Sequence, residues 1–218
     1  MSVKINKSDM AYDRLEQMIT FQELKPGSMM SEAELMNMTG LGRTPIREAL
    51  QRLAWERMVE IHPRRGAIIP LISVDVQIKL LEVRRAVEEQ AVRLASHRAS
   101  VEQKQAMLQL AEELEGTTED HDGGRTYGNL LKRIHELLVL AAQNEYLELA
   151  IAPLQGLSRR FWFANLGQNR NIELRTGAGL HANILRAICH SDENAAATAS
   201  RALNDYLTEF TYRTLRRS

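Results

Sequence analysis

Apolar residues recur every three or four positions through most of the chain, the spacing of a single buried face on an α-helix. Beyond residue 75 this spacing is broken only at short polar or glycine-bearing segments, which lie near Ser100 and at residues 116–124, 143–144, 167–171 and 191–192. The breaks divide this part of the chain into about six helices, and no strand-like alternation occurs there. The pattern therefore predicts a mostly α protein whose residues 73–218 form an all-α helical bundle.

The residues before the bundle are patterned as three short helices. Residues 9–20 and 31–38 are amphipathic, and Ser31 is placed to cap the second of these helices. After a glycine-containing turn, Thr44 and Pro45 predict the start of a third helix, because the threonine oxygen can cap free backbone N–H groups and proline suits the first turn. The buried stripe of this helix is Ile46, Ala49, Leu50 and Leu53.

A β-hairpin with a basic tip follows the third helix. Residues 59–62 and 67–70 are β-prone runs on either side of Pro63-Arg-Arg-Gly66, so they can pair as a small wing. Two helices joined by a tight turn and followed by such a wing make a winged helix-turn-helix. Residues 1–72 are therefore predicted to form a DNA-binding domain, and residues 73–218 a second domain.

The arginines of the first domain are placed where they can contact DNA. The N-terminal turn of a recognition helix meets base edges, and arginine offers a planar fork to guanine or to phosphate oxygens. A wing tip can lie against the DNA backbone or a minor groove. We therefore predict DNA contacts from the third helix, the wing and the first helix, through Arg43, Thr44, Arg47, Arg64, Arg65, Gly66 and Arg14. The alternative is that these are ordinary solvated charges on a small helical domain.

The charge balance limits how such a domain can bind DNA. The chain of 218 residues has a formal net charge of zero, and its first 70 residues carry ten Lys or Arg against nine Asp or Glu. DNA affinity must therefore come from where the charges lie. One module that neutralises few phosphates binds weakly and in a salt-sensitive way, so we expect a homodimer on a two-fold operator of double-stranded DNA.

Cys189 is the only cysteine, which excludes an intramolecular disulfide and indicates a reducing compartment. No apolar run approaches the length of a membrane span, and the first ten residues lack the apolar core of a signal peptide. We therefore expect a cytoplasmic protein that does not bind a membrane.

Three motifs of the first domain, all within residues 24–70, are LKPG, RTPIREALQRL and PRRG. They resemble the winged helix-turn-helix of GntR-family bacterial transcription regulators, and this resemblance implies a DNA-binding regulator. Two positions depart from the family pattern: Gly42 stands where a serine is usual, and Ala33 where an arginine is common. Loss of these polar groups can remove a phosphate contact or shift the operator preference.

Three stretches of the second half carry a further resemblance: LLEVRRAVEEQAVRLA, RIHELLVLAAQNEYL and LHANILRAICHSDENAAATASRALNDYL. They resemble the FCD-type effector-binding domain found in the FadR subfamily of these regulators. Together with the first domain, the resemblance covers nearly the whole chain. It implies a ligand-responsive regulator, by default a repressor that its ligand releases from DNA.

Four polar side chains are predicted to point into the bundle from different helices: Arg84, His135, His181 and Tyr206. An arginine that faces a core needs an anion, which is either an internal carboxylate such as Glu88 or the acid group of a ligand. Each histidine or tyrosine alone can also be a hydrogen-bonded core residue. Together the four predict a pocket that orients a small organic acid effector.

The FCD resemblance also suggests a metal. In many domains of this type one Asp and three His hold a divalent ion, with the Asp one turn before the first His. His135 and His181 match two of these positions, but Leu131 occupies the Asp position and Tyr206 the third His position. Two imidazoles without a carboxylate make a poor metal site. We expect that no cofactor is required, and weak binding of a divalent metal at the two histidines is the alternative.

The sequence thus favours a homodimeric transcription regulator that senses a metabolite and has no catalytic residues. The alternative is a ligand-binding or scaffolding protein whose winged helix contacts protein, for which Ala33 and Gly42 leave room. An enzyme is disfavoured, because the sequence contains no nucleophile with a base at a recognisable spacing, no HExxH and no phosphate-binding loop.

Overall fold

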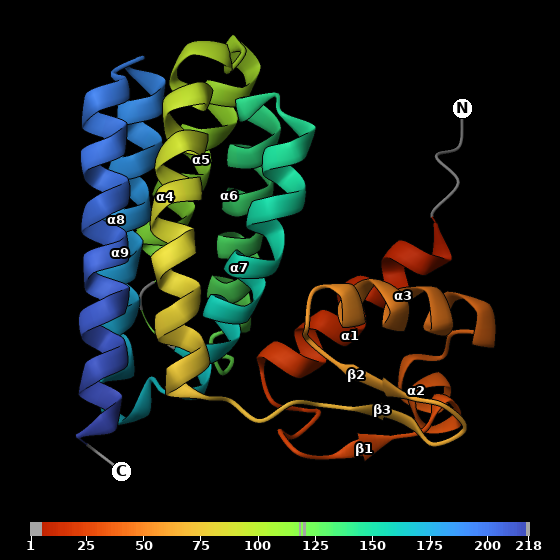
Figure 1. Ribbon diagram of the computed structural model, residues 1–218. Helices are drawn as coiled ribbons and strands as arrows, with labels where there is room; N and C mark the ends of the chain where they lie inside the picture. The colour runs from red at the N-terminus through yellow and green to blue at the C-terminus, as the bar shows by residue number, and fades with distance from the viewer. Residues whose placement is uncertain (1–5, 118, 120, 217–218) are drawn as a thin grey trace. The chain divides into compact units, whose positions relative to one another are not determined.

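The computed structural model describes residues 6–117, 119 and 121–216, which form two compact units divided between Ser73 and Val74. Short helices and a small sheet make up the first unit, and longer helices the second (Figure 1). The mostly α architecture predicted from the spacing of apolar residues is confirmed.

The first unit packs three short helices with a small antiparallel sheet. Its elements are α1 Lys7–Thr20, β1 Met29–Met30, α2 Glu32–Thr39, α3 Arg43–Trp55, β2 Glu60–His62 and β3 Gly66–Ile68. Helix α1 packs on α3 around apolar side chains that are almost fully buried, among them Leu15, Met18, Ile46 and Leu53. Burying one such side chain contributes about 1.5–3 kcal/mol. The predicted winged helix-turn-helix is confirmed.

The start of α2 is as predicted, and the start of α3 is not. The Ser31 side chain accepts a hydrogen bond from the Glu34 backbone N–H, and the Glu34 carboxylate accepts one from the Ser31 N–H, which makes a capping box. In α3, by contrast, Gly42 is the cap residue without a side-chain hydrogen bond, and Pro45 is the third helical residue. Because proline fits anywhere in a first turn, the Thr44 and Pro45 pair locates the helix start only to within that turn.

The wing is a three-stranded sheet in which β3 lies between β1 and β2. In the hairpin, Ile61 pairs with Ala67 and His62 with Gly66. Strand β1 was not predicted from the sequence, because two residues are too few to show an alternating pattern. Gly66 has a φ of +116°, and a Cβ there would overlap the backbone carbonyl of Met30. Only glycine therefore allows β1 to pair so closely with the start of β3.

The second unit consists of helices joined by short breaks. Its elements are α4 Val74–Arg98, α5 Val101–Gly116, α6 Arg125–Ala142, α7 Glu145–Ala164, the 3-10 turn η1 Gly167–Asn169, α8 Arg170–Cys189 and α9 Glu193–Leu215. Across the described residues this gives the six predicted α-helices, and the breaks match the predicted segments except after α7, where the break covers residues 165–169 and not 167–171. Within the 116–124 segment, residues 118 and 120 lie outside the described residues. Side chains of Ser100, Asn144 and Asp192 cap the helices that follow them.

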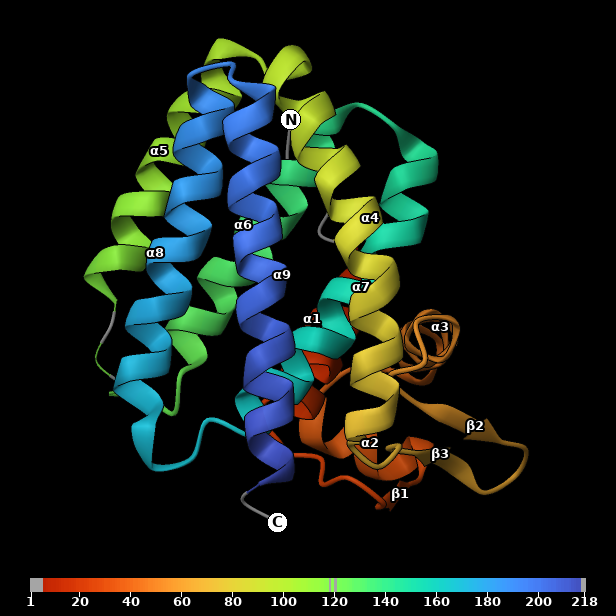
Figure 2. The same cartoon turned by 60° about the vertical axis from the view of Figure 1, so that its left-hand side comes forward.

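Helix α4 has a central position in the bundle, because it contacts α6, α7, α8 and α9. Figures 1 and 2 both show α4, α8 and α9 side by side along most of their length. Five helices thereby surround a small group of buried polar residues. Among the described residues, none of the helices combines the length and the hydropathy that a membrane span requires.

Candidate functional site

The exposed face of α3 carries the first group of predicted DNA-binding residues. Ile46 and Leu53 bury the opposite face of the helix. Arg43, Thr44 and Arg47 are consequently exposed, and the two arginine side chains retain 66% and 57% of their accessible surface. Their guanidinium groups are open to a partner that lies along the N-terminal half of α3.

A groove of about 600 Å³ lies between α3, the start of α2 and the wing. Most of the predicted DNA-binding residues line it: Arg43, Arg47, Arg64, Arg65 and Gly66. Thr44 does not line the groove, and Arg14 of α1 instead forms an ion pair with Glu23 at 3.5 Å. The fold thus brings arginines from α3 and from the wing tip to one concave surface.

An acidic residue in this groove, Glu32, was not predicted from the sequence. Its Oε1 accepts a hydrogen bond from Nε of Arg47 at 2.8 Å, and its Oε2 lies 3.4 Å from Nε of Arg43. Both contacts use the inner nitrogen of the guanidinium, so the terminal nitrogens stay available for another partner. An acidic residue in the first turn of a helix is also explained by its favourable interaction with the helix dipole. The position of Glu32 in the sequence therefore did not reveal its contacts with the two arginines.

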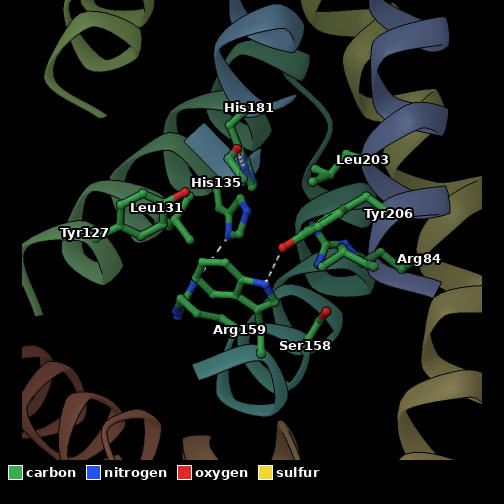
Figure 3. Close-up of a pocket in the computed structure, with 12 residues that line it drawn as sticks. Arg84, Tyr127, Leu131, His135, Ser158, Arg159, His181, Leu203 and Tyr206 are labelled. Atoms are coloured by element: carbon green, nitrogen blue, oxygen red, sulfur yellow. Dashed lines mark hydrogen bonds between the residues drawn. The ribbon is translucent and has the colours of Figure 1, made fainter. Parts of the chain in front are cut away.

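A small cavity lies inside the helical unit (Figure 3). The centre of a water molecule can occupy a volume of about 20 Å³ inside it, so the cavity has room for one or two waters. Side chains from α4, α6, α7, α8 and α9 line it, and they include all four residues predicted for the effector site: Arg84, His135, His181 and Tyr206.

Two buried imidazoles face this cavity and each other, with ring centroids 5.6 Å apart. Nδ1 of His135 lies 3.3 Å from a terminal nitrogen of Arg159, and Nδ1 of His181 lies 2.8 Å from the carbonyl oxygen of Gly177. The buried Nε2 atoms of both rings have no hydrogen-bond partner among the described residues. Burial lowers the pKa of His135 well below its ordinary value and that of His181 to about 4, so both rings are neutral at pH 7.

The anion that Arg84 requires is internal. Its Nε and one terminal nitrogen donate to the two carboxylate oxygens of Glu88 at 3.1 and 3.0 Å. Glu88 also accepts hydrogen bonds from Gln155 and Asn204, which ties α4 to α7 and α9. Burial alone would raise the pKa of Glu88, but the charge of Arg84 and these hydrogen bonds outweigh it and hold that pKa below its ordinary value. Arg84 therefore lines the cavity as one half of an ion pair.

The phenol of Tyr206 is engaged on both sides. Its O–H donates to Glu173 at 2.6 Å, and its oxygen accepts from the indole N–H of Trp162 at 3.0 Å. Burial and the neighbouring Glu173 carboxylate raise the pKa of Tyr206, so the phenol stays protonated.

Arg159 also lines the cavity, is buried, and was missed in the sequence analysis. A signal was present, because Arg159 follows Ile151 and Gln155 of α7 at steps of four residues, and both of those side chains are buried. Two arginines, Arg84 and Arg159, therefore line the cavity.

The donor set does not fit a divalent metal. Leu131 presents only carbon to the cavity, and Tyr206 is held by Glu173 and Trp162. In the described part of the chain, no group of three or more His, Cys, Asp or Glu side chains is placed to hold a metal ion. The guanidinium group of Arg159, which lies 3.3 Å from Nδ1 of His135, would also repel a dication.

Comparison with known proteins extends this picture. Residues 7–69 match the family described as bacterial regulatory proteins of the gntR family, and residues 79–205 match the FCD domain. The Nta operon transcriptional regulator of Aminobacter aminovorans is 32% identical over 177 residues, which cover 79% of this chain and 80% of that protein. The chain belongs to the GntR family. This GntR-family protein is also 26% identical to the galactonate operon transcriptional repressor of Escherichia coli K12, over 90% of this chain and 93% of that protein.

Solved structures support the fold of the GntR-family chain. E. coli McbR/YncC superposes with a TM-score of 0.80 at 18% identity, covering 97% of this chain and 99% of that one. A GntR regulator from Rhodococcus sp. RHA1 gives 0.69 at 18% identity, covering 97% and 98%. The family assignment confirms the resemblance seen in the sequence, and it makes the chain a transcription regulator with a DNA-binding helix-turn-helix domain and not an enzyme.

Proposed function

We propose that this regulator acts as a homodimeric repressor that binds a two-fold operator and releases it when a small organic acid occupies the bundle. One relative that matches nearly the whole chain is named as a repressor. The mechanism is thermodynamic linkage. The ligand binds better to a bundle arrangement in which the two recognition helices are misplaced for the operator, and it therefore weakens operator binding. The operator weakens ligand binding by the same factor.

In this proposal the arginines of α3 and those of the wing contact different parts of the DNA. Arg43 and Arg47 at the start of α3 present their terminal nitrogens to base edges, where an arginine fork matches guanine. Arg64 and Arg65 at the wing tip contact phosphates or the minor groove. Arg14 is the weakest candidate of the predicted set, because it pairs with Glu23 and does not line the groove.

The observation that carries the effector proposal is a small cavity inside the bundle whose lining residues include buried polar side chains. Buried polar atoms are nearly always paired, yet the Nε2 atoms of His135 and His181 are buried without partners. Arg84 and Arg159 line the same space, and among the described residues no Asp or Glu does, but the charge of Arg84 is already paired with Glu88. A small anion offers acceptors to the polar hydrogens beside this space and is attracted by the positive charge of Arg159, so an organic acid is the ligand class that the cavity favours. Since its present volume admits only water, the lining side chains must move apart when the acid enters.

A second copy of the chain is the proposed occupant of two groups of exposed apolar side chains, one near the start of α4 and one near the start of α7. Val76 and Val83 lie one heptad apart on α4, and Tyr146 and Leu149 lie three residues apart on α7; all four are more than half exposed. Helices α4 and α7 contact one another. Exposed apolar groups of this kind mark interaction surfaces, and a two-fold operator requires two copies.

Trp162 provides a direct test of the effector proposal. It is buried beside the cavity, whereas the other tryptophan of the chain, Trp55, is exposed on α3. In a Trp55→Phe variant, we expect small carboxylic acids to change the fluorescence of Trp162 and to weaken binding of a duplex selected from a random pool. Neutral amides of the same acids are the control. Equal responses to acids and amides, or acids that leave both signals unchanged, would contradict the proposal.

A further inference from the structure

The two imidazoles of the cavity are held by partners of opposite kind. A backbone carbonyl can only accept a hydrogen bond, so Gly177 fixes the proton of His181 on Nδ1 and leaves a lone pair on Nε2. A guanidinium can only donate, so Arg159 fixes a lone pair on Nδ1 of His135 and places the proton on Nε2. The unpartnered Nε2 atoms are therefore one donor, on His135, and one acceptor, on His181.

This pattern of donors and acceptors differs from the pattern that a metal site requires. A histidine that binds a metal gives a lone pair to the ion and hands its other N–H to an acceptor. His181 meets this requirement, because its Nδ1–H donates to the carbonyl of Gly177. His135 does not, because Arg159 donates to its Nδ1 and so leaves the proton on Nε2. As long as Arg159 donates to Nδ1, Nε2 of His135 carries a proton and cannot be a ligand.

We propose that the cavity binds a small hydroxy acid without any metal. The carboxylate accepts from Nε2–H of His135 and is attracted by the guanidinium group of Arg159, while the hydroxyl donates to Nε2 of His181. The inference rests on the proposed effector function and narrows its ligand class. Arg159 is in this account a positioning residue for His135 as well as a charge beside the ligand.

The acceptor on His181 is what selects the hydroxyl. An acid without a hydroxyl leaves this buried lone pair unpaired, which lowers affinity. An amino acid could donate from its ammonium group, but that positive charge would lie near the guanidinium group of Arg159. A hydroxyl donates without adding a charge, so hydroxy acids fit better than the corresponding simple acids or amino acids.

The tautomers can be measured directly, before any ligand is known. In long-range ¹H–¹⁵N spectra of the full chain at pH 7, we expect His135 to be protonated on Nε2 and His181 on Nδ1, with signals assigned from His135→Gln and His181→Gln variants. Arg159→Lys, which keeps a donor, should preserve the tautomer of His135, and Arg159→Met should not. A wild-type spectrum in which His135 is protonated on Nδ1 overturns the inference, whatever the variants do.

Matched acids then test the ligand class. Glycolate is compared with acetate, lactate with propionate and alanine, and malate with succinate, by Trp162 fluorescence in the Trp55→Phe variant with chelator present. We expect the hydroxy member of at least one set to bind on the order of tenfold tighter or more, and Arg159→Met to remove this preference.

The outcomes separate the two proposals. If acids bind with no preference for the hydroxyl, the hydroxy-acid inference fails and the organic-acid effector stands. If binding of the hydroxy acid needs added Zn²⁺ or Mn²⁺, the metal-free inference fails in the same way. If none of the acids binds, both proposals are overturned.

Discussion

At the scale of single residues, Arg84 and Glu88 are a buried pair whose members are costly to separate. Arg84→Met leaves the Glu88 carboxylate buried without its counter-charge. Loss of one partner of such a pair costs about 3–5 kcal/mol. We expect the single variant to lose that much free energy of unfolding, and Arg84→Met with Glu88→Gln to recover most of it, because the introduced glutamine amide retains an acceptor for Asn204.

Urea unfolding followed by circular dichroism measures both variants. A double variant as unstable as the single one would show that the buried charge of Glu88 is not the source of the loss. Arg84→Ala would destabilise the bundle for the same reason. A changed effector response in that variant would reflect the broken ion pair as well as any lost contact between Arg84 and the ligand.

His181 makes the stability of the bundle depend on pH. Its pKa is about 4 in the folded chain and 6.5 ordinarily, so the unfolded state binds more protons between these values. Stability therefore falls as pH drops below 6.5, by on the order of 2 kcal/mol for this residue between pH 7 and pH 5. His135 is shifted in the same direction. Glu88, whose pKa lies below its ordinary value of 4.5, stays ionised in this range.

Thermal melts at pH 7 and pH 5 check this expectation. His181→Leu should flatten the pH dependence, because it removes the buried imidazole. A wild-type melting temperature that does not change between the two pH values would contradict the neutral, buried state of His181.

At the scale of elements, Glu32 links α2 to Arg43 and Arg47, the two arginines of α3 that we propose contact DNA bases. It holds the inner nitrogens of Arg43 and Arg47 and so limits the positions of two flexible side chains before DNA binds. Glu32→Gln removes the charge and loosens both arginines. We expect a few-fold gain in affinity for random duplex, because one repulsive charge is lost, together with a smaller preference for the selected sequence.

Competition binding measures both effects, with Glu60→Gln as the control. Glu60 is exposed on β2 and does not line the groove, so its variant removes the same charge without touching the arginines. If the two variants change affinity and preference alike, Glu32 acts only through its charge.

The elements themselves were largely predictable from the sequence, because breaks such as Ser100 and Asn144 combine a capping side chain with an interruption of the apolar pattern. The start of α3 was misplaced because proline is tolerated throughout a first turn. Strand β1 depends on pairing with β3, which no local pattern shows.

The candidate site was predictable only in part. Helical periodicity placed Arg84, His135, His181 and Tyr206 around one cavity, as the structure has them. It could not show that Glu88 neutralises Arg84, nor that Arg159 reaches His135 from another helix, because those contacts depend on how helices pack. The direction of hydrogen bonding at the two histidines, on which the hydroxy-acid proposal rests, is likewise a property of the packed bundle.

At the scale of the whole molecule, the proposed dimer would double the number of DNA contacts. Val83→Glu with Leu149→Glu places one charge in each of the two exposed apolar groups of α4 and α7, and we expect sedimentation equilibrium to show a monomer with weakened operator binding. Leu108→Glu, at an exposed position of α5, is the matched control and should remain dimeric. A dimer that survives the double substitution would place the interface elsewhere.

The central claim is that arginines at the start of α3 select a DNA sequence, and competition between a duplex selected from a random pool and its scrambled counterpart tests this most directly. We expect the wild type to prefer the selected duplex by on the order of a thousandfold or more. Arg43→Ala with Arg47→Ala should abolish the preference, and Arg64→Ala with Arg65→Ala should weaken both duplexes alike. A wild type that binds the two duplexes equally, or a preference that survives the loss of Arg43 and Arg47, would contradict the account.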